Sequence, residues 1–459
     1  MIRELVEPNF VKGRAVDLAD ELKRRSKGFR ECNATVRSKA DEAGITLDDL
    51  KQAQQIVAKV ASEGDFARGE EEAAWLPRDP YLSILQSTLH EFYVKASALK
   101  EEHPKSRLAR SSRDPVTDLG LKPEWYPTKK RPFMRQTEES DWLGWGLSFA
   151  VAKAISAIGR KPPFREQKQA YPLQPRARLV LVGDWASGVR RAGNVAAYIA
   201  EQLNQASVRG IDRHVIHLGD VYYAGRDFEY VAHLGDMWPV KTGEDDRIGS
   251  WCLNGNHDMF SGGQALFAFL QRDSRFKRQN GCTHFALENK DWLIFGLDTA
   301  YESEGFKGNT GGLAAPQAVW IMERIRRAPD KKIILLSHHQ PFSAWEGESP
   351  RLLEALQPVL HGPREIAAWF WGHEHRCAIY APHFNVRYPS LIGHGGVPVY
   401  ASSKEPKGPK VLFHDRRSFP HLLEKYAYLG FAVLDLDGPN ATVAYIDENG
   451  KKIREGDTF

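Results

Sequence analysis

The distribution of hydrophobic and polar positions divides the chain near residue 165. Before that point, apolar residues recur with a helical period over 15–26, 47–62 and 81–101. A polar stretch with several prolines, 103–137, has the composition of a connector. We therefore predict that residues 1–165 form a mainly helical N-terminal region and linker.

Residues 141–159 stand out within this first part because they combine tryptophan, leucine and phenylalanine in one helical stretch. Such a helix can lie on a membrane surface, but that position is typical of helices with a rich basic face, and this one carries only Lys153. We therefore favour a helix docked on the catalytic domain over peripheral membrane contact. A transmembrane segment is not expected either, since no uninterrupted run of about 20 apolar residues occurs.

From residue 176 onwards the pattern changes to short apolar runs of strand length, which alternate with helical stretches. Two pairs of such runs predict antiparallel hairpins, one turning at 289–290 and the other at 437–440. This alternation is typical of an α/β fold with buried strands. We predict a layered β-sandwich with flanking helices for residues 166–459, as a single catalytic domain.

The amino-acid composition excludes several classes of protein. The 459 residues are 42% apolar and 27% charged, which is ordinary for a globular protein. Because the net charge of +4 is small and dispersed, we expect no nucleic-acid partner. Four scattered cysteines exclude a disulfide scaffold, and the charged start lacks a secretory pattern, so we expect a cytoplasmic protein.

Potential metal ligands follow the predicted strands of the second part. In open α/β sheets, ligands bind beyond the carboxyl ends of the strands, so we expect these side chains to converge on one crevice. The groups that follow the strands are Asp184, Asp220, Asn256, His338, His339, His373 and His375.

Carboxylates and imidazoles crowded in one place repel one another or shift their pKa values, whereas divalent cations satisfy them. Mixed oxygen and nitrogen ligands suit iron, manganese or zinc better than calcium. The ligands are sufficient for two ions, provided that one carboxylate bridges them. Two metals about 3.5–4 Å apart clamp a phosphoryl group and supply hydroxide near neutral pH.

The order and spacing of these motifs resemble the calcineurin-like metallophosphoesterase superfamily over residues 177–447. The motifs are the metal-binding Asp184, GDxxY at 219–223, GNHD at 255–258, the HxP histidine His339, and GHxH at 372–375. Within the superfamily the pattern is most similar to the purple acid phosphatases, because GDxxY supplies Tyr223, which in that family ligates a ferric ion.

The resemblance implies a ligand set for each of two metals. One ion is expected to bind Asp184, Asp220, Tyr223 and His375. The other is expected to bind Asp220, Asn256, His339 and His373, with Asp220 as the bridge. Many superfamily members carry a histidine two residues after the first aspartate; here that position is Ala186, and Tyr223 would fill the vacancy.

The resemblance also implies the catalytic groups. His257 is expected to protonate the leaving oxygen, and Asp258 to orient His257 through its other ring nitrogen. The HxP spacing to Pro341 selects His339 over His338, which we expect to pack behind the ligands.

These observations predict a dinuclear metal-dependent phosphoester hydrolase, either a phosphomonoesterase or a phosphodiesterase, that uses a metal-bound hydroxide. The alternative is a catalytically weak phosphoesterase-like fold that serves as an interaction scaffold through its helical N-terminal region. The intact ligand set favours the enzyme, because a scaffold has no need of His257 beside it.

Overall fold

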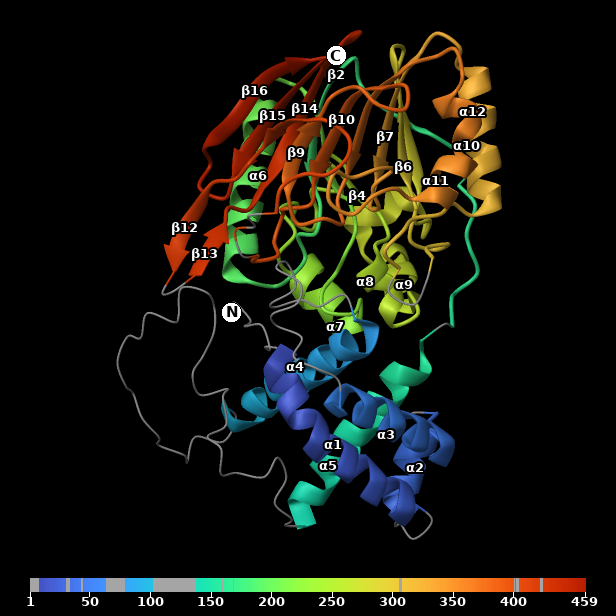
Figure 1. Cartoon of the computed structure of the whole chain (residues 1–459), viewed down its shortest axis with the longest axis vertical. Helices are drawn as coiled ribbons and strands as arrows, with labels where there is room; N and C mark the ends of the chain where they lie inside the picture. Colours follow the sequence, from blue (N-terminus) through green and yellow to red (C-terminus); the bar gives the residue numbers. More distant parts are fainter. Residues whose placement is uncertain are drawn as a thin grey trace. The chain divides into compact units, whose positions relative to one another are not determined.

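The computed structural model divides the chain into two compact units, which are described one at a time (Figure 1). The first comprises Met1–Arg160 with Phe260–Gly262, and the second comprises Lys161–Met259 with Gly263–Phe459. The residues described are 8–29, 34–42, 44–62, 79–101, 138–158, 160–167, 169–304, 308–399, 401, 404–421 and 424–459. The connector predicted at 103–137 lies outside them.

The first unit is helical, as predicted. Its helices are α1 (Pro8–Gly28), α2 (Ala34–Glu42), α3 (Leu47–Ser62), α4 (Pro80–Glu101) and α5 (Glu138–Ser156). Helix α3 begins where the sequence provides a cap: the Thr46 hydroxyl accepts from the Asp49 N–H at 3.2 Å, and the Asp49 carboxylate accepts from the Thr46 N–H at 2.8 Å. The short, mostly polar α2 was not predicted.

Helix α5 corresponds to the tryptophan-rich stretch. Its described apolar side chains, among them Leu147, Val151 and Ile155, are buried. The helix packs against α1, α3 and α4 of its own unit. Within its own unit the helix is therefore docked on neighbouring helices, and its docking on the catalytic domain stays a prediction.

The second unit contains a six-stranded sheet in the order β16-β15-β14-β2-β3-β4. Strands β2, β3 and β4 are parallel, and β14 to β16 form an antiparallel extension. The hairpin of β14 and β15 turns between Asp437 and Asn440, as predicted. The bounds are β2 Arg176–Val182, β3 Asp212–His217, β4 Gly249–Cys252, β14 Gly430–Asp437, β15 Asn440–Asp447 and β16 Lys452–Thr458.

An eight-stranded sheet in the order β1-β5-β6-β7-β8-β10-β9-β11 forms the other layer. Strands β6, β7, β8 and β10 are parallel, and β5 pairs antiparallel with β6 in the predicted hairpin. The bounds are β1 Tyr171–Pro172, β5 Phe285–Glu288, β6 Trp292–Leu297, β7 Lys332–Ser337, β8 Ile366–Trp371, β9 Cys377–Tyr380, β10 Val386–Ile392 and β11 Val411–His414.

The two sheets enclose the main core. Leu181 of β2 and Leu336 of β7 belong to one buried cluster that spans both sheets, whereas Leu335 faces the opposite side. Alternation along each strand therefore buries both faces. Helix α6 (Arg190–Val208) packs on β2 and β3, and α10 (Ala315–Arg327) covers the outer face of the eight-stranded sheet (Figure 1). The predicted layered sandwich with flanking helices is confirmed.

Shorter elements complete the unit. They are α7 Asp227–Glu229, the π-helix η4 Tyr230–Gly235, α8 Asn256–Phe260, α9 Gln264–Arg272, the 3-10 helix η5 Ser274–Gln279, α11 Pro350–Ala355, α12 Gln357–Leu360, β12 Ser418–His421 and β13 Glu424–Ala427. Helices α11 and α12 contribute Leu352 and Val359 to the same outer cluster as α10.

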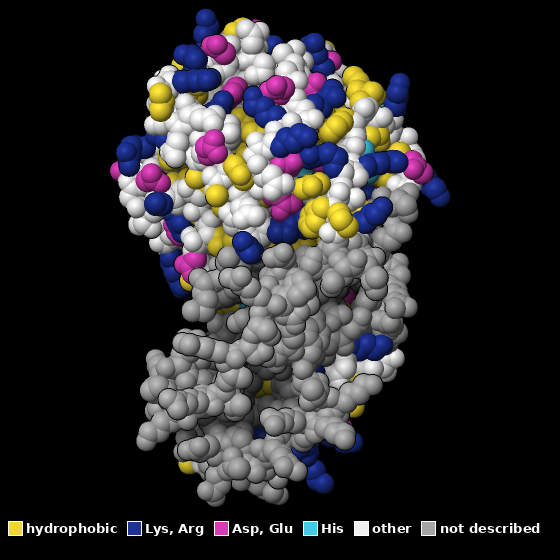
Figure 2. Space-filling model, turned by 90° about the vertical axis from the view of Figure 1, so that its left-hand side faces the viewer, with side chains coloured by type: hydrophobic (Ala, Val, Ile, Leu, Met, Phe, Trp, Pro, Cys, Tyr) yellow, Lys and Arg dark blue, Asp and Glu magenta, His cyan; other side chains and the backbone are white. Residues whose placement is uncertain are grey.

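The described surface mixes charges of both signs. Figure 2 shows Lys and Arg side chains interspersed with Asp and Glu across the second unit, which agrees with the small net charge of +4. Among the helices in the described part of the chain, none is both long and apolar enough to span a bilayer.

Candidate metal centre

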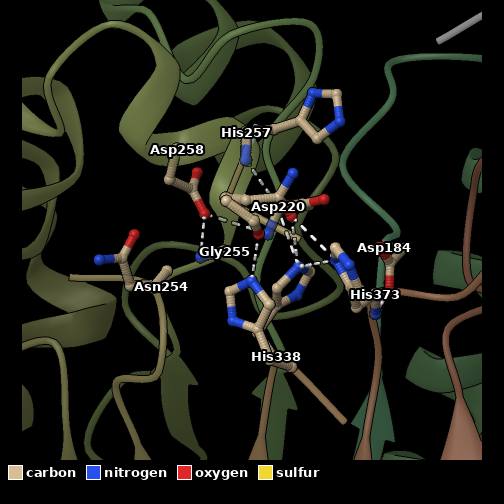
Figure 3. Close-up of polar contacts among 12 residues, drawn as sticks. Asp184, Asp220, Asn254, Gly255, His257, Asp258, His338 and His373 are labelled. Carbon is tan, nitrogen blue, oxygen red and sulfur yellow. Dashed lines mark hydrogen bonds and ion pairs between the residues drawn. The ribbon is translucent and has the colours of Figure 1, made fainter. Parts of the chain in front are cut away.

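The ends of five strands from both sheets meet at one place. Strands β2, β3 and β4 run parallel in the first sheet, as do β7 and β8 in the second, so their carboxyl ends bring the predicted ligands together. Figure 3 shows the Asp220 side chain amid this group, with His338 and His373 beside it. The expected convergence of the strand ends is therefore present.

The backbone turns sharply where the ligands begin. Asp184, Asp220 and His373 have φ angles of 54°, 73° and 69°, in the left-handed region that non-glycine residues rarely adopt. Such conformations concentrate at functional sites, where the surrounding structure holds them in place. Close packing explains one of the motif glycines, since a Cβ atom on Gly255 would lie 2.1 Å from Oδ1 of Asp220.

A first group of side chains surrounds a tyrosine hydroxyl. The hydroxyl of Tyr222 lies 2.9 Å from Oδ1 of Asp184 and 3.0 Å from Oδ2 of Asp220. Nε2 of His375 lies 3.1 Å from the same hydroxyl and 3.6 Å from Oδ1 of Asp184. Two carboxylates, a phenol and an imidazole thus face one another in a buried space.

A second group lies on the other side of Asp220. Nε2 of His338 is 2.9 Å from Oδ1 of Asn256 and 3.4 Å from Oδ1 of Asp220. Nδ1 of His373 is 3.0 Å from the same Asn256 oxygen and 3.2 Å from Nε2 of His338. Asp220 is therefore the carboxylate common to both groups.

The hydrogen bonds of the two adjacent histidines distinguish their roles. Nδ1 of His338 lies 3.0 Å from the carbonyl oxygen of Leu218, which can only accept, so Nδ1 carries the proton and Nε2 presents a lone pair to the site. His339 differs, because its Nε2 donates to the carbonyl of Gly308 at 2.7 Å and its Nδ1 lies 3.0 Å from the Thr299 hydroxyl. These contacts favour His338 as the ligand, but His339 belongs to the same group of potential ligands, so the choice of His339 stays a prediction.

The two adjacent tyrosines also differ in their contacts, and the predicted ligand role of Tyr223 stays a prediction. Both are fully buried, so burial does not separate them. The hydroxyl that meets Asp184 and Asp220 belongs to Tyr222, not to the predicted Tyr223. Among the contacts of Tyr223 are two made by its backbone: its N–H donates to Glu229 at 2.6 Å, and its carbonyl accepts from His257.

The ring of His257 lies over that of Tyr222, with the ring centroids 4.5 Å apart. Its Nδ1 donates to the Tyr223 carbonyl at 2.6 Å, which leaves Nε2 as the nitrogen that would exchange a proton with a substrate. The carbonyl of Tyr223 therefore orients this ring, a task that we predicted for Asp258.

Asp258 has a different set of partners. Its carboxylate accepts from the N–H groups of Asp220, Val221 and Gly255 at 2.7–3.1 Å, and from the hydroxyl of Tyr230. Burial and the nearby Asp220 carboxylate raise the pKa of Asp258 to about 7. The residue thereby fixes the loop that carries Asp220, and its role as the orienting group of His257 stays a prediction.

The donor set fits a divalent or trivalent cation. Burial, followed by the charges of Asp184 and Asp220, raises the pKa of Tyr222 well above its usual value, because both disfavour a phenolate. A cation reverses that penalty. Two groups of side chains have ligand atoms within 4.8 Å of one another and the composition of a metal site. The first group is Asp184, Asp220 and His338, and the second is His338, His339 and His373.

The part of the chain that carries this candidate centre matches a known protein family. A family model described as calcineurin-like phosphoesterase matches residues 177–377, which contain every ligand discussed above. Residues 177–377 are a calcineurin-like phosphoesterase domain. The superfamily expected from the motifs is thus confirmed.

Several individual proteins are similar to parts of this chain. Human tartrate-resistant acid phosphatase type 5 is 25% identical over 303 residues, which cover 61% of this chain and 90% of the relative. A probable glycerophosphodiester phosphodiesterase GpdQ of Arcobacter nitrofigilis is 26% identical over 169 residues, covering 35% of this chain and 56% of the relative. Among solved structures, a dimetal phosphatase from Danio rerio covers 62% of this chain and 99% of its own at 13% identity, with a TM-score of 0.40. The calcineurin-like domain places the chain among the hydrolases of phosphoric esters.

Proposed function

We propose that this calcineurin-like phosphoesterase is a dinuclear metal hydrolase that acts on phosphoric monoesters or diesters. The observation that carries the proposal is Asp220, whose two oxygens face different ligand groups: Oδ2 faces Tyr222 and Oδ1 faces His338. A carboxylate in this position can bridge two cations.

The structure supports a revised ligand set for each ion. One ion would bind Asp184, Asp220, Tyr222 and His375. The other would bind Asp220, Asn256, His338 and His373. Iron, manganese or zinc suits these oxygen and nitrogen donors. Bound in pairs, such ions supply hydroxide near neutral pH and withdraw charge from the phosphoryl oxygens.

A side chain of the protein would supply the proton that the reaction needs. Attack at phosphorus breaks the bond to the leaving oxygen, which then needs a proton. Nε2 of His257 is the proposed donor, because its Nδ1 is fixed by the Tyr223 carbonyl. Burial of the surrounding groups excludes water and strengthens each electrostatic interaction.

The division of the chain at residue 165 is part of the proposal. Residues 166–459 would act as the catalytic domain, and the helical region 1–165 would contribute another task, such as binding a partner. A cytoplasmic location agrees with the three described cysteines, which are buried as free thiols.

The test measures metal content and turnover together. We expect about two ions per wild-type chain and hydrolysis of p-nitrophenyl phosphate or of its bis ester. Asp220→Asn should lose both ions and activity, because the amide cannot bridge as a charged carboxylate does. Asp330→Asn, at an exposed position in a turn, is the matched control and should retain both.

Two results would contradict the proposal. An Asp220→Asn enzyme with wild-type turnover would exclude the bridging role. A wild-type chain that binds no transition metal and hydrolyses none of a broad set of phosphoesters would favour the scaffold alternative instead.

A further inference from the structure

The outer nitrogen of one ligand histidine faces a carboxylate that no motif contains. Nε2 of His373 lies 3.7 Å from Oε2 of Glu346, and the two side chains are 1% and 20% exposed. The opposite nitrogen of the same ring, Nδ1, lies 3.0 Å from Oδ1 of Asn256. One ring therefore stands between the metal centre and Glu346.

This arrangement has a chemical requirement. A histidine that binds a cation through Nδ1 must carry its proton on Nε2. In a buried position, that N–H needs an acceptor, because an unpaired donor costs about 1–3 kcal/mol. A carboxylate is the strongest acceptor available, and it also increases the basicity of the ring.

The loop that carries Glu346 is fixed to the metal-binding motif. The Ser343 hydroxyl donates to Oε2 of Glu374 at 2.7 Å, and Glu374 stands between His373 and His375 in sequence. The same hydroxyl oxygen accepts from the N–H groups of Trp345 and Glu346 at 2.9 and 3.1 Å. The backbone at Glu346 is thus tied to the loop that its side chain faces.

We propose that Glu346 is a positioning residue for the metal centre. It holds His373 in the Nδ1-binding tautomer and strengthens its bond to the ion that Asn256 and His338 share. This inference rests on the proposed dinuclear function, and it concerns one of the two ions. Because Glu346 acts through His373, removal of the Glu346 carboxylate should weaken the binding of one ion much more than the binding of the other.

The experiment is chelator competition with Zn²⁺ on the full chain, which reports the affinity of each ion separately. We expect Glu346→Ala to lower the affinity of one ion about 10–100-fold and to leave the other within about 2-fold. Glu346→Gln keeps the shape and one acceptor oxygen without the charge, so we expect an intermediate loss. Glu348→Gln, two residues further along at an exposed position, should behave as wild type.

A second measurement separates positioning from general stability. The melting temperature of the metal-free protein should be the same in wild type and Glu346→Gln, whereas a structural role would lower it. At saturating Zn²⁺, kcat should recover most of its wild-type value.

Three outcomes overturn the inference. Equal Zn²⁺ affinity in wild type, Glu346→Gln and Glu346→Ala would show that Glu346 does not act on His373. An equal loss at both ions, or a lowered melting temperature of the metal-free variants, would assign it a general structural role. If wild type itself bound no pair of ions, the proposed function would fail instead, so the two failures are distinguishable.

Discussion

Nε2 of His338 and Oδ1 of Asn256 lie 2.9 Å apart, although 82 positions separate the two residues in the chain. His338 follows β7 of the eight-stranded sheet, whereas Asn256 begins the helix that follows β4 of the six-stranded sheet. The candidate metal centre thus combines side chains from both sheets. A bound cation would join the two layers as well as the ligands.

The assignment of His338 predicts opposite outcomes for two adjacent residues. His338→Ala removes a nitrogen that faces Asn256 and Asp220, so we expect it to lose one ion and on the order of 10²-fold or more in kcat/KM. His339→Asn removes hydrogen bonds to Gly308 and Thr299, so we expect both ions to remain. Metal analysis and turnover of the two variants provide the measurement. The reverse ranking would restore His339 as the ligand.

Much of this centre could be predicted from the sequence, because the motifs follow buried strands and parallel strands share one edge. This reasoning predicted that the aspartates, Asn256, His373 and His375 lie together, and the structure brings them together. The pairs 222/223 and 338/339 were not resolved, since neighbouring residues offer the same chemistry and differ only in where the backbone directs each side chain. Spacing to Pro341 favours His339, whereas the hydrogen bond between His338 and the carbonyl of Leu218 supports the proposed role of His338.

The tyrosine assignment has a spectroscopic test. If ferric iron occupies the site that Asp184, Asp220 and His375 surround, the isolated protein should show a visible charge-transfer band from the bound phenolate. We expect this band to disappear in Tyr222→Phe, because its hydroxyl lies 2.9 Å from Oδ1 of Asp184. It should persist in Tyr223→Phe, which is the matched control. Loss of the band in Tyr223→Phe alone would return the ligand role to that residue.

Asp258 should contribute to stability through the loop that it holds. Asp258→Asn replaces a carboxyl group whose oxygens accept from backbone N–H groups with an amide whose NH2 would face the N–H groups of Asp220, Val221 or Gly255. We expect the free energy of unfolding of the metal-free protein to fall by about 2–4 kcal/mol. Urea denaturation measures this change, and Asp246→Asn, at an exposed carboxylate, is the control. A change under about 0.5 kcal/mol would mean that the loop is held by other contacts.

His284 predicts a dependence of stability on pH away from the metal centre. Its ring stacks on Phe164 with centroids 5.1 Å apart, and Nε2 accepts the N–H of Gln167 at 3.3 Å. Burial lowers the pKa of His284 from 6.5 to about 3, so the folded state keeps the ring neutral. Below pH 6.5 the imidazole of His284 binds a proton in the unfolded chain, whereas in the folded chain it stays neutral. The contribution of His284 is therefore complete above pH 6.5 and is lost as the pH falls towards 3.

The measurement compares wild type with His284→Phe, which keeps an aromatic ring but cannot be protonated. Between pH 7 and 4.5 we expect the free energy of unfolding to fall by about 2–3 kcal/mol more in wild type than in the variant. His361→Gln, at an exposed histidine, should follow the wild-type profile. Parallel profiles for wild type and His284→Phe would show that the ring is already protonated, or equally accessible, in the folded state. Wild type and the two variants contain the same carboxylates, which titrate in the same pH range. The difference between the stability profiles of wild type and His284→Phe therefore reports the contribution of the His284 imidazole alone.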